Sequence, residues 1–262
     1  MQWINTACAQ QGSGEITVNV PSRDWLVTDL EARLCKGEGF CLATLNLDHV
    51  VKLQHDKTFR DAYAAHTHIT ADGRPIVWLS QLAGQQIDLL PGSDLMLPLI
   101  ALAERLHCPI GLFGASQDAL ETATARLQAQ FPQLSIAATI APPMGFDPEG
   151  DAAAEYIETL KASGARIVFV ALGAPKQELF ARRAYAAAPQ IGFASIGAGV
   201  DFIAGTQTRA PRIMRFLAAE WLWRLAGNPK RLAGRYLACF AILPRLGGWA
   251  LQDRLSGKTQ AR

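Results

Sequence analysis

Cysteine is scarce in this chain, and the few cysteines present are not grouped. There are five in 262 residues, an odd number, and no two are spaced as C-x-x-C. Scattered cysteines of this kind argue against a disulfide framework and against a zinc site, so we expect a protein of the reducing cytoplasm. The cysteines are Cys8, Cys35, Cys41, Cys108 and Cys239.

Long hydrophobic runs are also missing. A helix that spans a bilayer needs about 18 or more consecutive apolar residues. The longest candidate, residues 236–251, is interrupted by a proline, an arginine and two glycines. Residues 1–14 show no basic start followed by an apolar core, so we expect no secretory signal. The sequence therefore predicts a protein that neither crosses the membrane nor is exported.

Motifs for nucleotide cofactors and metal ions are absent as well. The dinucleotide fingerprint G-x-G-x-x-G does not occur, since Gly111 and Gly114 form only G-x-x-G. No D-x-D pair is present for a divalent ion. The five histidines do not converge, and we expect His66 and His68 to form a solvated pair rather than a metal site. The sequence thus predicts neither a cofactor nor a metal.

Half of the residues are apolar, which is enough for a full core and favours one elaborated α/β domain. Apolar, β-rich runs alternate with helical patterns, which indicates a mainly parallel sheet flanked by helices. Helix starts are expected at Ser93–Asp94, at Ser116 and at Ala174–Pro175. The predicted strands are Phe40–Leu47, Pro109–Phe113, Leu134–Ile140, Arg166–Leu172 and Gln190–Ile196.

The last fifty residues differ in charge from the rest. Residues 209–262 carry eleven Lys and Arg against two acidic residues, a net charge of +9 within a chain of net +2. We expect a core over 1–208 and a helical appendage over 209–262. Pro211 suits the start of its first helix, Gly227 its end, and Asn228–Pro229 the start of its second.

Aromatic residues lie among the arginines of this appendage. Together they are typical of a surface that contacts anionic lipid headgroups. Nucleic acid is a rival ligand, but no recognised nucleic-acid module is visible. A plain packed helix pair with solvated arginines is a further alternative. The aromatic residues are Phe216, Trp221, Trp223, Tyr236, Phe240 and Trp249.

Small and polar residues follow the predicted strands, where ligands of parallel sheets bind. Asp72 follows the short run 68–70 and is a candidate general base, although a turn aspartate is the alternative. Gly199, within residues 197–201, is a candidate contact for a ligand phosphate, with an ordinary tight turn as the alternative. Thr44 and Asn46 lie at the end of the first predicted strand, with Asp48–His49 just after it, and residues 172–178 begin at the end of the fourth.

Several motifs occur in an order that resembles the WecG/TagA/CpsF glycosyltransferases, glycosyltransferase family 26. The resemblance covers about residues 40–240. The motifs are T-x-N at Thr44 and Asn46, A-D-G at Ala71–Gly73, G-S-D-L at Gly92–Leu95, L-G-A-P-K-Q-E at Leu172–Glu178, D-F-I-A-G with R-A-P from Asp201 to Pro211, and E-W-L-W-R-L at Glu220–Leu225.

This resemblance implies a Rossmann-like core with a C-terminal, membrane-associating helical appendage. It implies inverting transfer from a UDP-sugar donor to an undecaprenyl-diphosphate-linked sugar, without a divalent metal. The protein would then be peripheral on the cytoplasmic face of the membrane. By the same resemblance Asp72 is the catalytic base. The substrate-binding residues are Thr44, Asn46 and Gln177 in the pocket, with Arg224 and Arg231 on the donor diphosphate.

The chain departs from the family pattern at two places. Leu89 and Leu90 stand where an arginine often precedes the G-x-D-L element, and Gly234, followed by Arg235, stands where a third appendage arginine is usual. The run A-D-G-R-P-I-V-W resembles the branch that adds glucose to lipid-linked glucose in xanthan-type exopolysaccharide assembly. Alternatives are an N-acetylmannosamine transferase, a soluble nucleotide-dependent enzyme and a non-catalytic membrane- or polyanion-binding module. The oligomeric state stays open, a homo-oligomer included.

Overall fold

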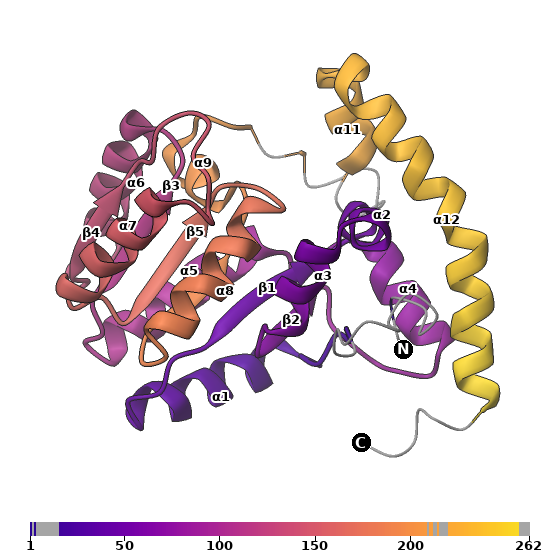
Figure 1. Ribbon diagram of the computed structural model, residues 1–262, viewed down its shortest axis with the longest axis horizontal. Coiled ribbons are helices and arrows are strands. Elements are labelled where there is room, and N and C mark those ends of the chain that lie inside the picture. The colour runs from indigo at the N-terminus through magenta and orange to yellow at the C-terminus, as the bar shows by residue number, and fades with distance from the viewer. Residues whose placement is uncertain (2, 4–15, 209, 212–213, 215–219, 257–262) are drawn as a thin grey trace.

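Six parallel strands form one sheet in the order β2-β1-β6-β5-β3-β4 (Figure 1). The structure is a computed structural model that describes Met1, Trp3 and residues 16–208, 210–211, 214 and 220–256. The strands are β1 (Cys41–Leu45), β2 (His68–Ala71), β3 (Ile110–Gly114), β4 (Ile136–Ile140), β5 (Ile167–Ala171) and β6 (Gly192–Ser195).

Burial explains why these segments are strands. Every residue of the five strands other than β4 is buried, as expected where helices cover both faces of a parallel sheet. β4 lies at an edge of the sheet and is partly exposed. Continuous apolar runs are the sequence pattern of such strands. The predicted α/β fold with a parallel sheet is confirmed.

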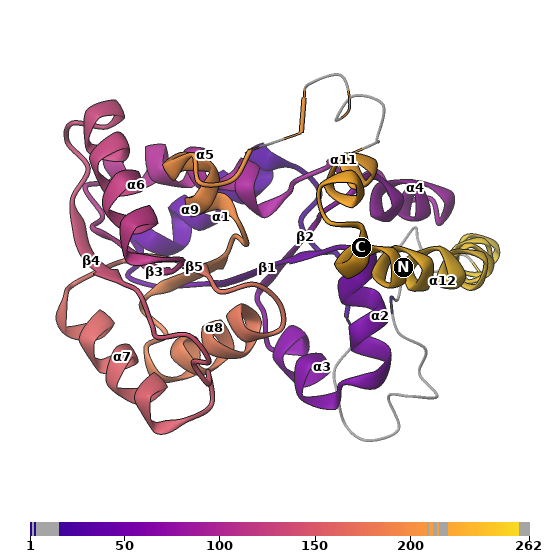
Figure 2. The ribbon, with the colours of Figure 1, turned by 90° about the horizontal axis from the view of Figure 1, so that it is seen from above.

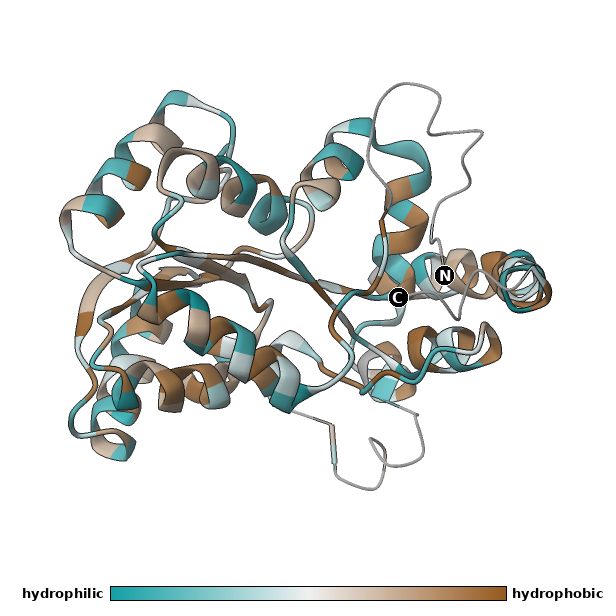
Figure 3. Cartoon of the chain, turned by 90° about the horizontal axis from the view of Figure 1, so that it is seen from below, coloured by the Kyte–Doolittle hydropathy of each residue, from teal (hydrophilic) through white to brown (hydrophobic). Residues whose placement is uncertain are grey.

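Helices cover both faces of the sheet. Figure 2 shows α2, α3, α7 and α8 on one face and α1, α5, α6 and α9 on the other. The helices are α1 (Arg23–Cys35), α2 (Leu47–His55), α3 (Lys57–Ala64), α4 (Arg74–Leu82), α5 (Gly92–Arg105), α6 (Gln117–Gln130), α7 (Asp151–Ala162), α8 (Lys176–Ala187), α9 (Gly199–Ala204), α11 (Glu220–Gly227) and α12 (Pro229–Leu255). In Figure 3 the strands consist mostly of hydrophobic residues, whereas hydrophobic and hydrophilic residues alternate along the helices.

Two of the three expected helix starts are shifted. Ser116 is the N-cap of α6 and accepts a hydrogen bond from the Ala119 amide, as predicted. α5 begins at Gly92, so Ser93 and Asp94 lie inside its first turn rather than before it. Pro175 is the N-cap of α8 instead of a residue of its first turn. Shifts of one or two residues are usual where a helix end is inferred from local pattern alone.

The C-terminal segment ends in the two expected helices, α11 and α12, which are separated at Gly227 and Asn228–Pro229. The expected start at Pro211 adjoins residues 212–213 and 215–219, which are outside the described part of the chain. α12 is 27 residues long, contains Pro244 in its interior and packs along α2 and α4 (Figure 1). Its Leu246 and Ala250 are fully buried in an apolar cluster with Val50, Leu53, Ile76 and Leu79.

α12 is nevertheless not a membrane span. Within the described ranges, no helix combines the length and the apolar character that crossing a bilayer requires. Its apolar residues are divided between a face buried on the protein and a face open to solvent, as with Leu246 and Leu237.

Candidate active site

Asp72 and Asn46 lie side by side at the carboxyl ends of β2 and β1. The two strands pair with Leu45 opposite Ala71, which brings the next residue of each strand together. The Asn46 Nδ2 donates to Asp72 Oδ2 at 3.3 Å, and the Asp72 amide donates to the Leu45 carbonyl at 2.8 Å. The Asp72 carboxylate is therefore held at the sheet edge while remaining partly open to solvent.

The orientation of Asn46 is set by a second role, as the N-cap of α2. Its Oδ1 accepts from the His49 amide at 3.0 Å. Because the oxygen is used by the cap, the amide nitrogen is the atom that turns to Asp72. A single side chain thus starts the helix and positions the candidate base.

Thr44 lies beneath this pair and is buried in β1. Its carbonyl accepts from the Tyr63 hydroxyl at 2.7 Å and lies 2.9 Å from His49 Nδ1. Burial lowers the pKa of His49 to about 4, so the ring is neutral near pH 7. Sequence reasoning placed His49 near the end of this strand but missed Tyr63, because only the fold shows that Tyr63 reaches the end of β1.

Gln177 and Gly197 lie at the same edge of the sheet, after β5 and β6. Gln177 is buried at the start of α8, and its Oε1 accepts from the Gly197 amide at 3.2 Å. Its Nε2 donates to Glu178 Oε1 at 2.8 Å. The Gln177 amide is therefore held at both ends and ties α8 to the turn after β6.

Gly199 has a packing reason to be glycine. A Cβ at this position would lie 2.8 Å from Ile196 Cδ1 and 3.2 Å from Met96 Sδ. Its amide donates to the Ile196 carbonyl at 3.3 Å. The tight-turn alternative thus accounts for this residue, and its contact with a ligand phosphate stays a prediction.

Glu178 is the most unusual acid in this region, and sequence reasoning gave it no role. It is fully buried, and one of its oxygens, Oε2, has no hydrogen-bond partner. Burial raises the pKa of the Glu178 carboxyl from 4.5 to about 7, against the opposing effects of Gln177 and Lys52. Near neutral pH this side chain is therefore partly protonated.

The strand order brings these residues to one edge of the sheet. Asp72, Asn46, Gly197 and Gln177 follow β2, β1, β6 and β5, which are consecutive in the sheet. The chain leaves β1 and β6 for opposite faces of the sheet, and ligands of parallel sheets bind at such points. Lys52 Nζ adds a bridge to the Ala174 carbonyl at 3.3 Å.

Arg224 and Arg231 belong to α11 and α12, but their side chains are outside the described part of the structure. Arg235, one turn after Arg231, pairs with Asp48 of α2, with Nη2 2.6 Å from Oδ2. Asp48 is two residues after Asn46, so this ion pair places α12 close to the end of β1.

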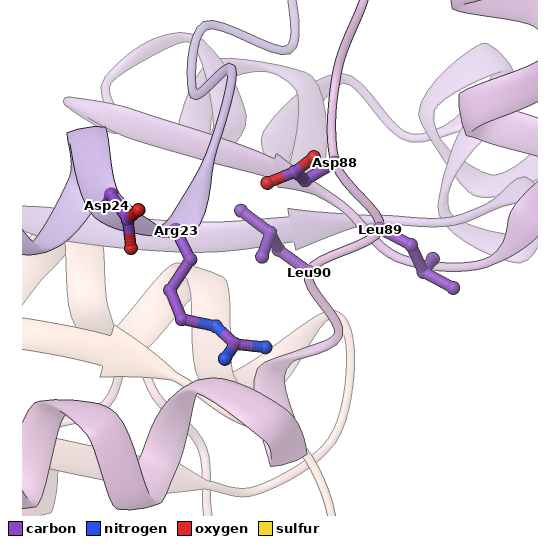
Figure 4. Close-up of a pocket in the computed structure, with 5 residues that line it drawn as sticks. All are labelled: Arg23, Asp24, Asp88, Leu89 and Leu90. Carbon is purple, nitrogen blue, oxygen red and sulfur yellow. The ribbon is translucent and has the colours of Figure 1, made fainter.

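The departure at Leu89–Leu90 adjoins the candidate base. Leu89 forms a parallel bridge with Ala71, and the Leu90 amide donates to the Ala71 carbonyl at 2.8 Å. Arg23, Asp24, Asp88 and the two leucines line a pocket there. Figure 4 shows Arg23 extending alongside Leu90. An arginine from another element is thus near the place where the chain lacks the family arginine.

The expectation of a solvated pair at His66 and His68 is wrong, because both rings are buried. His66 Nδ1 lies 2.7 Å from the Ala62 carbonyl, and His68 Nε2 lies 2.9 Å from Asp29 Oδ2. The two rings have separate partners and do not form a pair, and His66 Nε2 is buried without a hydrogen-bond partner. Within the described residues no three His, Cys, Asp or Glu side chains gather to hold a metal ion.

The described aromatic residues of the appendage are partly packed and partly exposed, and Phe216 lies outside the described residues. Trp221 packs edge-on against Tyr236 and Phe240, with ring centroids 5.7 and 5.2 Å away, and so joins α11 to α12. Trp249 is half-buried under Arg245, whose Cζ lies 4.9 Å from the ring centroid. The large apolar residues exposed on these helices are Leu222, Trp223, Leu237, Phe240, Leu251 and Leu255.

The geometry thus presents a carboxylate at the ligand-binding edge of a parallel sheet, with a basic helix beside it. A comparison with protein families matches residues 14–259, nearly the whole chain, to the family described as Glycosyl transferase WecG/TagA/CpsF family. The chain belongs to the WecG/TagA/CpsF family of glycosyl transferases.

Proposed function

We propose that this protein is an inverting, metal-independent transferase that moves a sugar, with glucose favoured, from UDP to an undecaprenyl-diphosphate-linked sugar. The observation that carries the proposal is the Asp72 carboxylate, held at the carboxyl edge of the sheet by Asn46 at 3.3 Å. A base at this place meets the requirement of the reaction, because the acceptor hydroxyl must lose a proton as it attacks. Family membership supplies the class of reaction.

In this mechanism the acceptor oxygen attacks the anomeric carbon from the side opposite to UDP. The new carbon–oxygen bond forms as the bond to the diphosphate breaks, and the configuration inverts. Asp72 takes the hydroxyl proton in the same step. Asn46 keeps the carboxylate oriented through its Nδ2, while its own Oδ1 stays on the cap of α2.

The leaving group gains negative charge that must be offset. The chain contains no D-x-D pair, so cationic side chains would offset this charge. We assign this role to Arg224 and Arg231, as the family resemblance implies. Guanidinium groups bind phosphate oxygens with paired, charge-assisted hydrogen bonds.

The appendage also suits the lipid-linked acceptor. Residues 209–262 carry a net charge of +9, and α11 and α12 expose leucine, tryptophan and phenylalanine side chains. Basic and apolar side chains together favour attachment to an anionic headgroup layer. We therefore place the protein on the cytoplasmic face of the membrane, where such acceptors are made.

A panel of radiolabelled UDP-sugars with synthetic lipid-linked mono- and disaccharide acceptors tests the proposal. Label from UDP-glucose should enter the lipid fraction, with inverted anomeric configuration in the product. Label from UDP-N-acetylmannosamine instead would replace the donor assignment. Vesicle binding without transfer from any donor would favour a non-catalytic binding module.

A further inference from the structure

One carboxylate connects three segments beside the candidate site. Asp48 lies in the first turn of α2, and its Oδ2 is 2.6 Å from Arg235 Nη2 and 2.8 Å from Lys52 Nζ. Lys52 also donates to the Ala174 carbonyl, in the loop that precedes α8. Asp48 thus joins α2 to α12 directly and to that loop through Lys52.

The carboxylate is well shielded. The Asp48 side chain is 12% exposed, against 42% for Arg235 and 36% for Lys52. A shielded carboxylate with two cationic partners is screened less by water and salt than a surface pair. Its place in the first turn of α2 also favours a negative charge. We therefore expect this ion pair to be more stable than an exposed surface pair.

Apolar packing holds α12 most firmly in its C-terminal half, where Leu246 and Ala250 are fully buried. The buried residues Leu232, Cys239, Leu246 and Ala250 recur at helical spacing along one face. The α12 residues in or against the apolar cluster with α2 and α4 are Ile242, Leu243, Leu246, Trp249 and Ala250, so this packing fixes the buried face of the helix beyond the turns that carry Arg231 and Arg235. The Asp48–Arg235 contact is an ion pair without hydrogen-bond geometry at Asp48 Oδ2, and it holds this earlier part of α12 close to α2.

We propose that Asp48 is a positioning residue that docks α12 through Arg235, and so sets the place of the helix turn carrying Arg231 relative to Asp72. Arg235 then serves the docking contact instead of the donor diphosphate. The effect on turnover rests on the proposed function, whereas the docking itself does not.

A cycle of D48N, R235Q and the double variant D48N/R235Q tests the proposal. Each single variant should lower kcat by roughly 10- to 100-fold, because displaced catalytic groups lose about that much, with little change in the KM for the UDP-sugar. The double variant should be no worse than the poorer single one, since all three variants lose the same Asp48–Arg235 contact. R235K, which keeps the charge, should recover part of the activity.

The matched control is D61N, which breaks the exposed Lys57–Asp61 pair on α3 and should leave kcat unchanged. Hydrogen exchange of α12 amides in the full-length protein gives a readout without substrate. D48N and R235Q should each speed exchange between residues 229 and 240, and D61N should not.

Three results would overturn the proposal. The first is multiplicative loss in the double variant, and the second is unchanged hydrogen exchange in both single variants. The third is weaker UDP binding in R235Q but not in D48N, which would place Arg235 on the donor. R235Q changes a partly exposed side chain, so it remains informative if D48N does not fold. If no UDP-sugar is transferred, the exchange data still test the docking contact.

Discussion

Glu178→Gln should change how stability depends on pH. The carboxyl of Glu178 has a pKa of about 7 in the folded protein against an ordinary value of 4.5, because it is buried. Between these pH values the folded state keeps a proton that the unfolded state loses. The stabilising effect of the protonated form is therefore complete below pH 4.5 and is lost as pH rises towards 7.

The size of this effect follows from the two pKa values. The difference between the two pKa values corresponds to roughly 3 kcal/mol in the free energy of unfolding, of which about 2–3 kcal/mol is lost between pH 5 and pH 8. Glutamine has nearly the same shape and keeps an oxygen to accept from Gln177 Nε2. Its NH₂ group would replace Oε2, which has no partner. The variant should therefore lack this loss of stability.

Urea unfolding of both proteins at pH 5 and pH 8 measures the difference. From pH 5 to pH 8 the wild type should lose about 2–3 kcal/mol relative to E178Q, and E178Q should be the more stable protein at pH 8. Contributions of the other titrating groups, such as His49 and His66, cancel in this comparison. Equal changes in the two proteins would show that Glu178 titrates normally and would refute the reasoning.

Three further predictions follow from the site and from α12. N46D keeps the oxygen that caps α2 but replaces the donor to Asp72 by a carboxylate oxygen. The kcat should therefore fall at least tenfold with a small change in melting temperature. An unchanged kcat would remove Asn46 from the site. L246A should cost about 2–5 kcal/mol in urea unfolding and the exposed L251A less than about 0.5 kcal/mol, whereas equal costs would contradict the burial of α12. EDTA should leave transfer intact, and activity that returns only with added Mg²⁺ or Mn²⁺ would refute metal-independent transfer.

Much of the fold could be predicted from the sequence because buried parallel strands have a simple pattern. Runs such as 167–172 are apolar throughout, and glycine, proline or serine marks many of the turns between elements. The strand order could not be predicted, since it depends on pairings such as β1 with β6, whose sequence separation is large. Local sequence pattern predicts which segments are strands or helices, whereas the order of the strands depends on pairing between distant parts of the chain.

The site was only partly predictable for the same reason. Asp72 and Asn46 could be named from motifs, but their contact depends on the register of β1 and β2. The burial of His66 and His68 could not be inferred from a polar H-x-H pattern. Likewise, Arg235 acquires a partner only when α12 packs on α2.

Turnover of Asp72→Asn with a lipid-linked acceptor and labelled UDP-sugar tests the central claim most directly. Asparagine has nearly the same size but cannot accept the proton, so kcat should fall by roughly two to four orders of magnitude. UDP binding by calorimetry and the melting temperature should stay close to those of the wild type. A folded D72N protein that transfers sugar at nearly the wild-type rate would contradict the assignment of Asp72 as the base.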